Sequence, residues 1–452
     1  MEIKIDRRSF VLMFSGVAGS LFFIFEDPLN AQDILPSRTI EAQGLLLQDL
    51  FNDWKLADKI DEAKQLLANS PPLGFNEAPQ KDKKGRVIKK KGQPVLEMTR
   101  KEIALAILDT ETGGVVEKRF WLNIAEVNKA NDLRKKYLPN PDNLPRFESE
   151  YLNEEFKVIS NWWNSFNSDL SVFKEETASD RYVVVANKYL MSNEDLAYPE
   201  DRTGEKYSDI VYVPYSPALK DKFLIATGKE FLNDHVRRAF KELAEAGVRS
   251  KAFPGWLVTD TMSETFVKNI FLTEQTDPKM MLTSSDGGRE LAERVFIRLG
   301  TNGEKAFRYT VSKTGASGLG QIMPATYASM FKGYSSAQLI KDTDIGRVDV
   351  KNGIKATALV LDDHLAGVKN RAYANGVSAR RRFDALNPDK LEEARGMAYN
   401  GGAGKYNTST GGLNTKSRGA KETAGFLQKF RMIRELDLFA QYAEIETQAV
   451  QQ

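Results

Sequence analysis

The side chains of this sequence that could carry out chemistry are mostly carboxylates. Its 452 residues include no cysteine and two histidines, His235 and His364, which lie far apart in the chain. A thiol nucleophile and a disulfide framework are therefore excluded, and a zinc site would have to form without sulfur ligands. Nothing around either histidine resembles a Ser-His-Asp site. The composition favours acid–base chemistry by aspartate or glutamate.

A polar, glycine-rich segment, residues 309–326, is the most informative part of the chain, and it reads YTVSKTGASGLGQIMPAT. Gly315 and Gly318 allow tight turns and the close approach of a ligand. Gln321 offers a donor and acceptors to a sugar hydroxyl or an N-acetyl group, and Met323 can form a soft apolar wall. The proline and threonine at its end suit the start of a helix. The segment predicts a ligand-binding loop that leads into a helix.

This segment resembles the signature of the soluble lytic transglycosylases, a lysozyme-like family related in fold to goose-type lysozymes. The signature Ser-x-x-Gly-Ala-x-Gly-Leu-x-Gln-x-Met-Pro-x-Thr matches at every specified position. Three later segments resemble family motifs in the same order: Asn352-Gly353-Ile354, the run AYNGGAG at 398–404, and Glu422-Thr423. The resemblance covers about residues 255–440 and gives no information on residues 32–230.

The resemblance implies an enzyme that cleaves the β-1,4 bond between MurNAc and GlcNAc in the glycan strands of peptidoglycan. A single glutamate acts as acid and base, and the 6-hydroxyl of the substrate replaces water, which leaves a 1,6-anhydro-MurNAc end. By resemblance, Ser312 would hydrogen-bond the substrate or the glutamate, and Gln321, Met323, Tyr399 and Asn400 would line the cleft. No metal or organic cofactor is implied.

Two glutamates compete for the catalytic role. The glutamate of the family ends an apolar helix before the loop. Glu274 ends the apolar run 266–273, where burial would raise its pKa toward the value that a general acid needs; this assignment requires an insertion of about one helix before Ser312. Glu304 lies nearer to the loop but follows the turn-forming tripeptide 301–303, which predicts a solvent-facing carboxyl with an ordinary pKa. We favour Glu274, with Glu304 as the alternative.

Two other functions remain open. A goose-type muramidase is a hydrolase and would use a second carboxylate, for which Asp342, Asp344 and Asp349 are candidates, although aspartates in such loops are usually caps. A non-catalytic peptidoglycan-binding or scaffold protein, within a protein complex of the cell envelope, is the other alternative. The net charge of +2 gives no argument for binding nucleic acid.

The elements that would position these residues are mostly helical. Apolar residues at helical spacing predict helices over residues 231–246, 264–272, 290–299, 350–365 and 423–442. Before them, the pattern predicts strands within 102–121, at 181–190 and at 210–213, and a helix over 152–175. The expected fold class is α+β, with a mainly α-helical, lysozyme-like domain over residues 255–445 preceded by a smaller α+β domain of unknown role over residues 99–254.

The N-terminal part has other roles. Residues 1–31 resemble an export signal, because three basic residues precede an apolar run from Phe10 to Phe25 and a small residue, Ala31, suits cleavage. Arg7 and Arg8 resemble the twin-arginine motif. An uncleaved signal anchor at the membrane is the alternative, since the run approaches spanning length. Either way the chain would be periplasmic or otherwise extracytoplasmic.

Residues 32–98 are expected to form a helical segment and a basic linker. Apolar residues at helical spacing predict a helix over residues 38–69. The stretch 81–93 carries seven lysine and arginine side chains, which could contact an anionic polymer or a membrane surface. We interpret it as a solvated linker.

Overall fold

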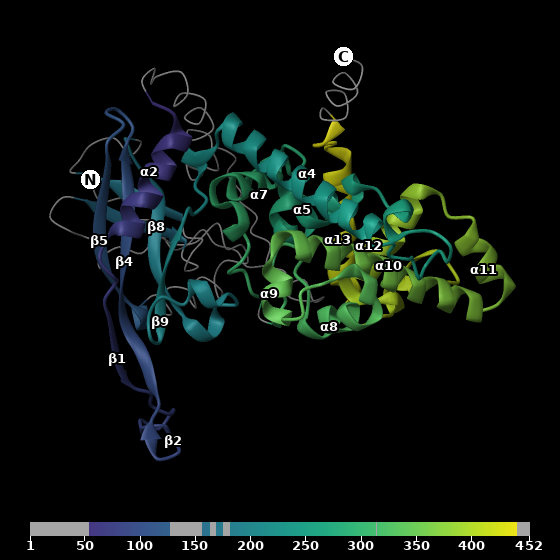
Figure 1. Ribbon diagram of the computed structural model, residues 1–452, viewed down its shortest axis with the longest axis horizontal. Coiled ribbons are helices and arrows are strands. Elements are labelled where there is room, and N and C mark those ends of the chain that lie inside the picture. The colour runs from purple at the N-terminus through teal and green to yellow at the C-terminus, as the bar shows by residue number, and fades with distance from the viewer. Residues whose placement is uncertain (1–53, 127–155, 163–168, 175–180, 313, 441–452) are drawn as a thin grey trace, which may run out of the picture.

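The computed structural model describes residues 54–126, 156–162, 169–174, 181–312 and 314–440. A five-stranded antiparallel sheet lies at one end of the molecule and a helical body at the other (Figure 1). The α+β fold class is confirmed. Residues 1–31, with the expected export signal, lie outside the described residues.

The sheet is built around one long strand, β4 (Leu96–Asp109). It pairs antiparallel with three strands, and β9 (Tyr207–Tyr212) adds to the last of them. The three are β1 (Phe75–Pro79), β5 (Val115–Asn123) and β8 (Tyr182–Ser192). The strands predicted within 102–121, at 181–190 and at 210–213 are thereby confirmed.

Both faces of β4 are buried, and its alternate side chains face different cores. Ile103, Leu105 and Ile107 pack with Tyr212 and Tyr309. The intervening side chains, Ala104, Ala106 and Leu108, pack with helix α2 (Leu56–Asn69). Helix α2 begins later than the predicted helix over 38–69, of which residues 38–53 lie outside the described residues.

The predicted helix over residues 152–175 is wrong. Strands β6 (Lys157–Trp162) and β7 (Asp169–Phe173) pair antiparallel in this region. Val172 is buried in the same core as Ile103 and Leu105. The short apolar runs in this region are compatible with either a helix or a strand, and packing against the sheet favours the strand.

The expected basic linker is instead a hairpin arm, which we define as residues 80–95. Strand β2 (Lys89–Lys90) pairs with β3 (Gln93–Pro94), and Lys81 bridges to Val87. The arm continues β1 and β4 beyond the sheet, in the lower left of Figure 1. The boundary expected between residues 98 and 99 therefore falls inside a strand. The lysine-rich composition of the arm is typical of any solvent-exposed segment, whether linker or hairpin. It therefore does not predict the pairing of these strands.

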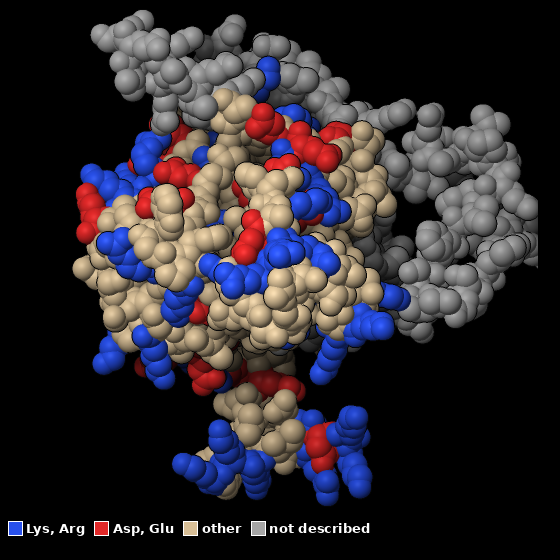
Figure 2. Space-filling view, turned by 90° about the vertical axis from the view of Figure 1, so that its right-hand side faces the viewer, with Lys and Arg blue, Asp and Glu red and all other residues tan. Residues whose placement is uncertain are grey.

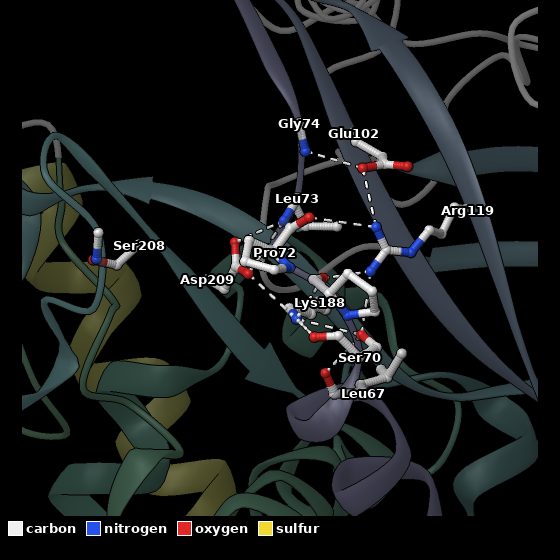
Figure 3. A network of polar contacts seen from close by, with 12 residues as sticks. Leu67, Ser70, Pro72, Leu73, Gly74, Glu102, Arg119, Lys188, Ser208 and Asp209 are labelled. Carbon is white, nitrogen blue, oxygen red and sulfur yellow. Dashed lines mark hydrogen bonds and ion pairs between the residues drawn. The ribbon is translucent and has the colours of Figure 1, made fainter.

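A buried polar network fixes the chain where it enters β1 (Figure 3). Lys188, 3 % exposed, donates from Nζ to the carbonyl oxygen of Ser70 at 2.9 Å and lies 3.2 Å from a carboxylate oxygen of Asp209. Asp209 accepts from the backbone N–H of Leu73 at 3.2 Å, and Glu102 accepts from that of Gly74 at 2.9 Å. The start of β1 is therefore tied to β4, β8 and β9.

The helical body contains ten α-helices in the described part of the chain between residues 222 and 435. They are α4 (Lys222–Glu245), α5 (Glu264–Gln275), α6 (Pro278–Thr283), α7 (Arg289–Asn302), α8 (Pro324–Gly333), α9 (Thr343–Val348), α10 (Val350–Ala374), α11 (Val377–Asp384), α12 (Pro388–Gly401) and α13 (Ala420–Glu435). The predictions at 231–246, 264–272, 290–299 and 350–365 are confirmed. The helix predicted over 423–442 ends at Glu435, and residues 441 and 442 are outside the described part.

Helix α10 lies at the centre of this body and packs against α4, α5, α8, α9, α11 and α12. Helix α4 shares its hydrophobic core, so the helical body begins near residue 222. The expected boundary between residues 254 and 255 therefore falls inside the helical body. No helix within the described residues is both long enough and apolar enough to cross a bilayer.

Helices α4 and α7 cross at two glycines. A Cβ on Gly228 would lie 1.8 Å from the carbonyl oxygen of Phe296. A Cβ on Gly300 would lie 2.5 Å from the carbonyl oxygen of Leu224. The two helix backbones are therefore in direct contact, which residues with larger side chains would prevent.

Candidate active site

Helix α5 carries Glu274 at its C-terminal end. Its eight residues from Phe266 to Thr273 are all buried, and the Ser263 hydroxyl caps its start by accepting from the N–H of Phe266 at 3.0 Å. Glu274 itself is partly exposed. Burial raises the pKa of Glu274 to about 7, against the opposing positive charge of Lys429 and with a contribution from the negative charge of Glu422. A carboxyl with this pKa can both donate and accept a proton near neutral pH.

Lys429 lies on α13 at the end of α5. Its side chain is 5 % exposed, and Nζ donates to the carbonyl oxygens of Thr273 and Thr276, each at 2.5 Å. Burial lowers the pKa of Lys429 to about 8, against the opposing charges of Glu274 and Asp277. A lysine here satisfies carbonyls that the helix leaves unpaired and places a cation near Glu274.

Replacement of Lys429 by methionine is expected to raise the pKa of Glu274 above about 7. Loss of a nearby positive charge favours the neutral carboxyl. If Glu274 is the acid, the alkaline limb of the pH profile of kcat/KM should move to higher pH. Lys332→Met, at an exposed lysine of α8, is the matched control and should leave the limb unchanged. An unmoved limb in Lys429→Met would show that Glu274 does not set it.

The glycine-rich segment forms a closed loop before α8. The Ser312 N–H donates to the carbonyl oxygen of Ala316 at 2.7 Å, and the Ala316 N–H donates to the Ser312 hydroxyl at 2.9 Å. Arg347, 6 % exposed, donates from Nη1 to the carbonyl oxygens of Gly315 at 2.7 Å and Ile322 at 3.3 Å. Gly318 has a φ of 74°, and its Cβ would lie 2.0 Å from the carbonyl oxygen of Arg347. The guanidinium and the glycine therefore hold the loop in one shape.

Two side chains connect this loop to helices of the body, one from the end of α5 and one from α12. Gln275 donates from Nε2 to the carbonyl oxygen of Leu319 at 2.8 Å. The Tyr399 hydroxyl, from α12, donates to the carbonyl oxygen of Gly320. Burial raises the pKa of Tyr399, and the negative charge of Glu274 raises it further, so these two groups interact. The structure thus brings Glu274, the loop and Tyr399 together.

The alternative glutamate, Glu304, belongs to a different environment. It lies in the short 3-10 helix Gly303–Lys305, and its side chain is 53 % exposed. Oε1 lies 2.7 Å from Nε2 of His235 on α4, and this hydrogen bond lowers the pKa of Glu304. The expected exposure is present, but the expected ordinary pKa is wrong. The lowered pKa of Glu304 was not predictable from the residues around it, because His235 lies far away in the sequence.

The other predicted site residues have different surroundings. The Ser312 hydroxyl is used inside its own loop, where it also contacts Thr314 at 3.1 Å. Gln321, with a φ of 48°, donates to the carbonyl oxygen of Gly318 at 2.8 Å. Met323 is 38 % exposed just before α8. Asn400 accepts from the Thr423 hydroxyl at 2.8 Å and joins α12 to α13.

The aspartates considered for a hydrolase serve as caps or ion-pair partners. Asp342 accepts from two N–H groups at the start of α9, and Asp349 accepts from the N–H of Asn352 at the start of α10. Asp344 pairs with Arg347 at 2.6 Å. Within the described residues, no group of three or more His, Asp or Glu side chains is placed to hold a metal ion.

A cavity of about 380 Å³ lies elsewhere, between α12, α13 and the strand β11 (Gly412–Leu413). Two of its lining residues, Lys390 and Arg431, both pair with a third, Glu393. It shares no residue with the Glu274 site. The cavity is therefore separate from the candidate active site.

Comparisons of the chain with protein-family models, curated proteins and solved structures found no match. The family resemblance therefore rests on the sequence motifs, and the candidate site rests on geometry.

Proposed function

We propose that this protein is a peptidoglycan lytic transglycosylase in which Glu274 is the acid and base. One observation carries the proposal: a partly exposed carboxyl with a pKa of about 7, at the end of a buried helix, lies beside the signature loop and Tyr399. Residues 255–445 would then belong to a lysozyme-like domain. The export signal proposed for residues 1–31 would place it outside the cytoplasm, where its substrate is found.

The reaction needs one group that first gives and then takes a proton. Protonated Glu274 donates to the glycosidic oxygen as the bond from MurNAc C1 to the GlcNAc oxygen breaks. The resulting carboxylate then removes the proton of the MurNAc 6-hydroxyl as that oxygen bonds to C1. Glu274 ends protonated, and no water is consumed. Ser312, Gly315, Gln321, Met323, Tyr399 and Asn400 are the proposed substrate contacts.

One observation favours a muramidase as the second candidate. The charge of Glu422, which is exposed at the start of α13, contributes to the raised pKa of Glu274, so a second carboxylate lies within electrostatic reach. A hydrolase could use such a group to activate water or to stabilise the sugar cation. A non-catalytic envelope scaffold remains the third candidate, but a carboxyl poised to transfer protons gives it no support.

Product analysis distinguishes these candidates. Purified peptidoglycan is incubated with the protein, and the released muropeptides are examined by mass spectrometry. We expect 1,6-anhydro-MurNAc ends, because the 6-hydroxyl replaces water. Reducing ends, one water heavier, that disappear in Glu422→Gln would instead establish a muramidase. Products absent from the parent protein as well as from Glu274→Gln would favour the scaffold.

A further inference from the structure

The arm carries a concentrated positive charge. Between residues 80 and 95 there are six lysines, one arginine and a single carboxylate, Asp82, which pairs with Arg86 at 2.8 Å. All seven cations are exposed: Lys81, Lys83, Lys84, Arg86, Lys89, Lys90 and Lys91. Within the described residues none of the six lysines forms an ion pair. Figure 2 shows these side chains around the tip of the arm, clear of the rest of the molecule.

Two partly exposed apolar side chains lie among these charges. Val87 is 41 % exposed and Ile88 is 37 % exposed, and both directly follow Arg86. Gly85 and Gly92, with φ of 79° and 83°, make the two turns at the tip. The arm thus presents cations and partly exposed β-branched residues at one narrow end.

We propose that the arm is a docking element for an anionic phospholipid surface. Such a surface attracts each nearby lysine, and its interfacial region accepts apolar side chains beside the charges. Lysine stems can cover apolar surface while their ammonium groups stay with the phosphates. Val87 and Ile88 would enter the interface, and the surrounding cations would remain among the headgroups.

The chemistry of the arm fits a bilayer better than it fits an anionic polymer. Residues 80–95 contain no aromatic side chain that could stack on a base or a sugar ring. Lysines outnumber arginine by six to one, and lysine acts as a point charge rather than a bidentate ligand for a particular phosphate. A soluble polymer would also leave Val87 and Ile88 in water.

The position of the arm allows it to dock without covering the candidate active site. The arm extends from the sheet on the side away from the helical body, whereas Glu274 lies at the end of α5, inside that body (Figure 1). The network around Lys188 and Glu102 fixes the start of β1, the strand that leads into the arm (Figure 3). This proposal is independent of the reaction at Glu274.

A fluorescent probe on the arm provides the test, because the chain has no cysteine of its own. Ile88→Cys in the full chain is labelled with an environment-sensitive dye and mixed with vesicles of phosphatidylglycerol and phosphatidylcholine in equal parts. We expect emission to move to shorter wavelength, and no movement with phosphatidylcholine alone. Val377→Cys, at a residue 65 % exposed on α11, is the control and should not respond. The proposal would be overturned if the emission of the dye at position 88 did not shift with the anionic vesicles, or if the dye at position 377 shifted equally.

A charge-matched pair of variants measures the contribution of the cations. The first variant replaces four lysines of the arm with glutamine: Lys83, Lys84, Lys90 and Lys91. The control makes the same replacement at four exposed lysines of the helical body: Lys222, Lys332, Lys341 and Lys416. With the Ile88 label, apparent affinity for the anionic vesicles should fall by at least about tenfold in the first variant and stay near the parent value in the second. Equal affinities would exclude the arm as the docking element. Binding to soluble polyglutamate without binding to vesicles would assign the arm to an anionic polymer instead.

Discussion

Replacement of Glu274 by glutamine is expected to lower the rate of peptidoglycan cleavage by about 10²- to 10⁴-fold, the usual cost of losing general acid–base catalysis. Glutamine keeps the shape and the hydrogen-bonding capacity of the side chain but cannot transfer the proton. The rate is measured as muropeptide release from purified peptidoglycan.

Glu304→Gln is the matched control and should stay within a few-fold of the parent. The hydrogen bond to His235 lowers the pKa of Glu304, which disfavours it as a proton donor, and Glu304 lies outside the site. An inactive Glu304→Gln with an active Glu274→Gln would reverse the assignment. Two active variants would refute the single-glutamate mechanism.

The stability of the Glu274→Gln variant should differ from the parent in a pH-dependent way. The pKa of Glu274 rises from an ordinary 4.5 to about 7 in the folded protein. The folded state therefore binds the proton more tightly, and this contribution to stability is lost as the pH rises from about 4.5 to about 7. Glutamine does not ionise, so above pH 7 the variant should be at least as stable as the parent. A variant that unfolds more easily there would indicate that lost packing, not the lost proton, explains its inactivity.

Gly228→Ala is expected to reduce the free energy of unfolding, although alanine normally favours a helix over glycine by about 1 kcal/mol. The new Cβ would lie 1.8 Å from the backbone oxygen of Phe296, so α4 and α7 would have to separate. A clash this close to backbone belongs at the upper end of the overpacking cost of about 1 to 3 kcal/mol, so after the gain in helix propensity we expect a net loss of about 2 kcal/mol.

Gly425→Ala makes the same change inside α13, where a Cβ meets no atom within 4 Å. It should raise the free energy of unfolding by up to about 1 kcal/mol. Denaturant unfolding of both variants measures the two signs. An unchanged or increased stability of Gly228→Ala would mean that the α4–α7 crossing is looser than the structure shows.

Regular periodicity made most of the fold predictable. Four of the five helices predicted for the helical body coincide with observed helices, and the predicted strands coincide with β4, β5, β8 and β9. Residues 152–175 were not predictable in this way, because the short apolar runs there fit a helix or a strand. The strands of the arm were not predictable either, because exposed, lysine-rich strands lack the alternation of apolar and polar residues that indicates a strand.

The candidate site was predictable only in part. The end of an apolar run located Glu274, and glycine spacing located the loop, since both signals are local. Lys429 was missed, although it lies three residues after Phe426 and four before Ile433, which places it on the buried side of α13. Its role depends on the carbonyl oxygens of α5, and contacts between elements far apart in the chain leave no local pattern.

The pairing of β4 on both sides has a consequence for the order of folding. β4 and β5 are joined by a short turn, so their ladder closes a small loop and can form early. The ladder of β4 with β8, by contrast, must bring Ala104 to Lys188 across a long intervening chain. Contacts so distant in sequence form slowly, whereas helices form from local contacts. We therefore expect the β4–β5 hairpin and the helices to appear before the β4–β8 ladder forms.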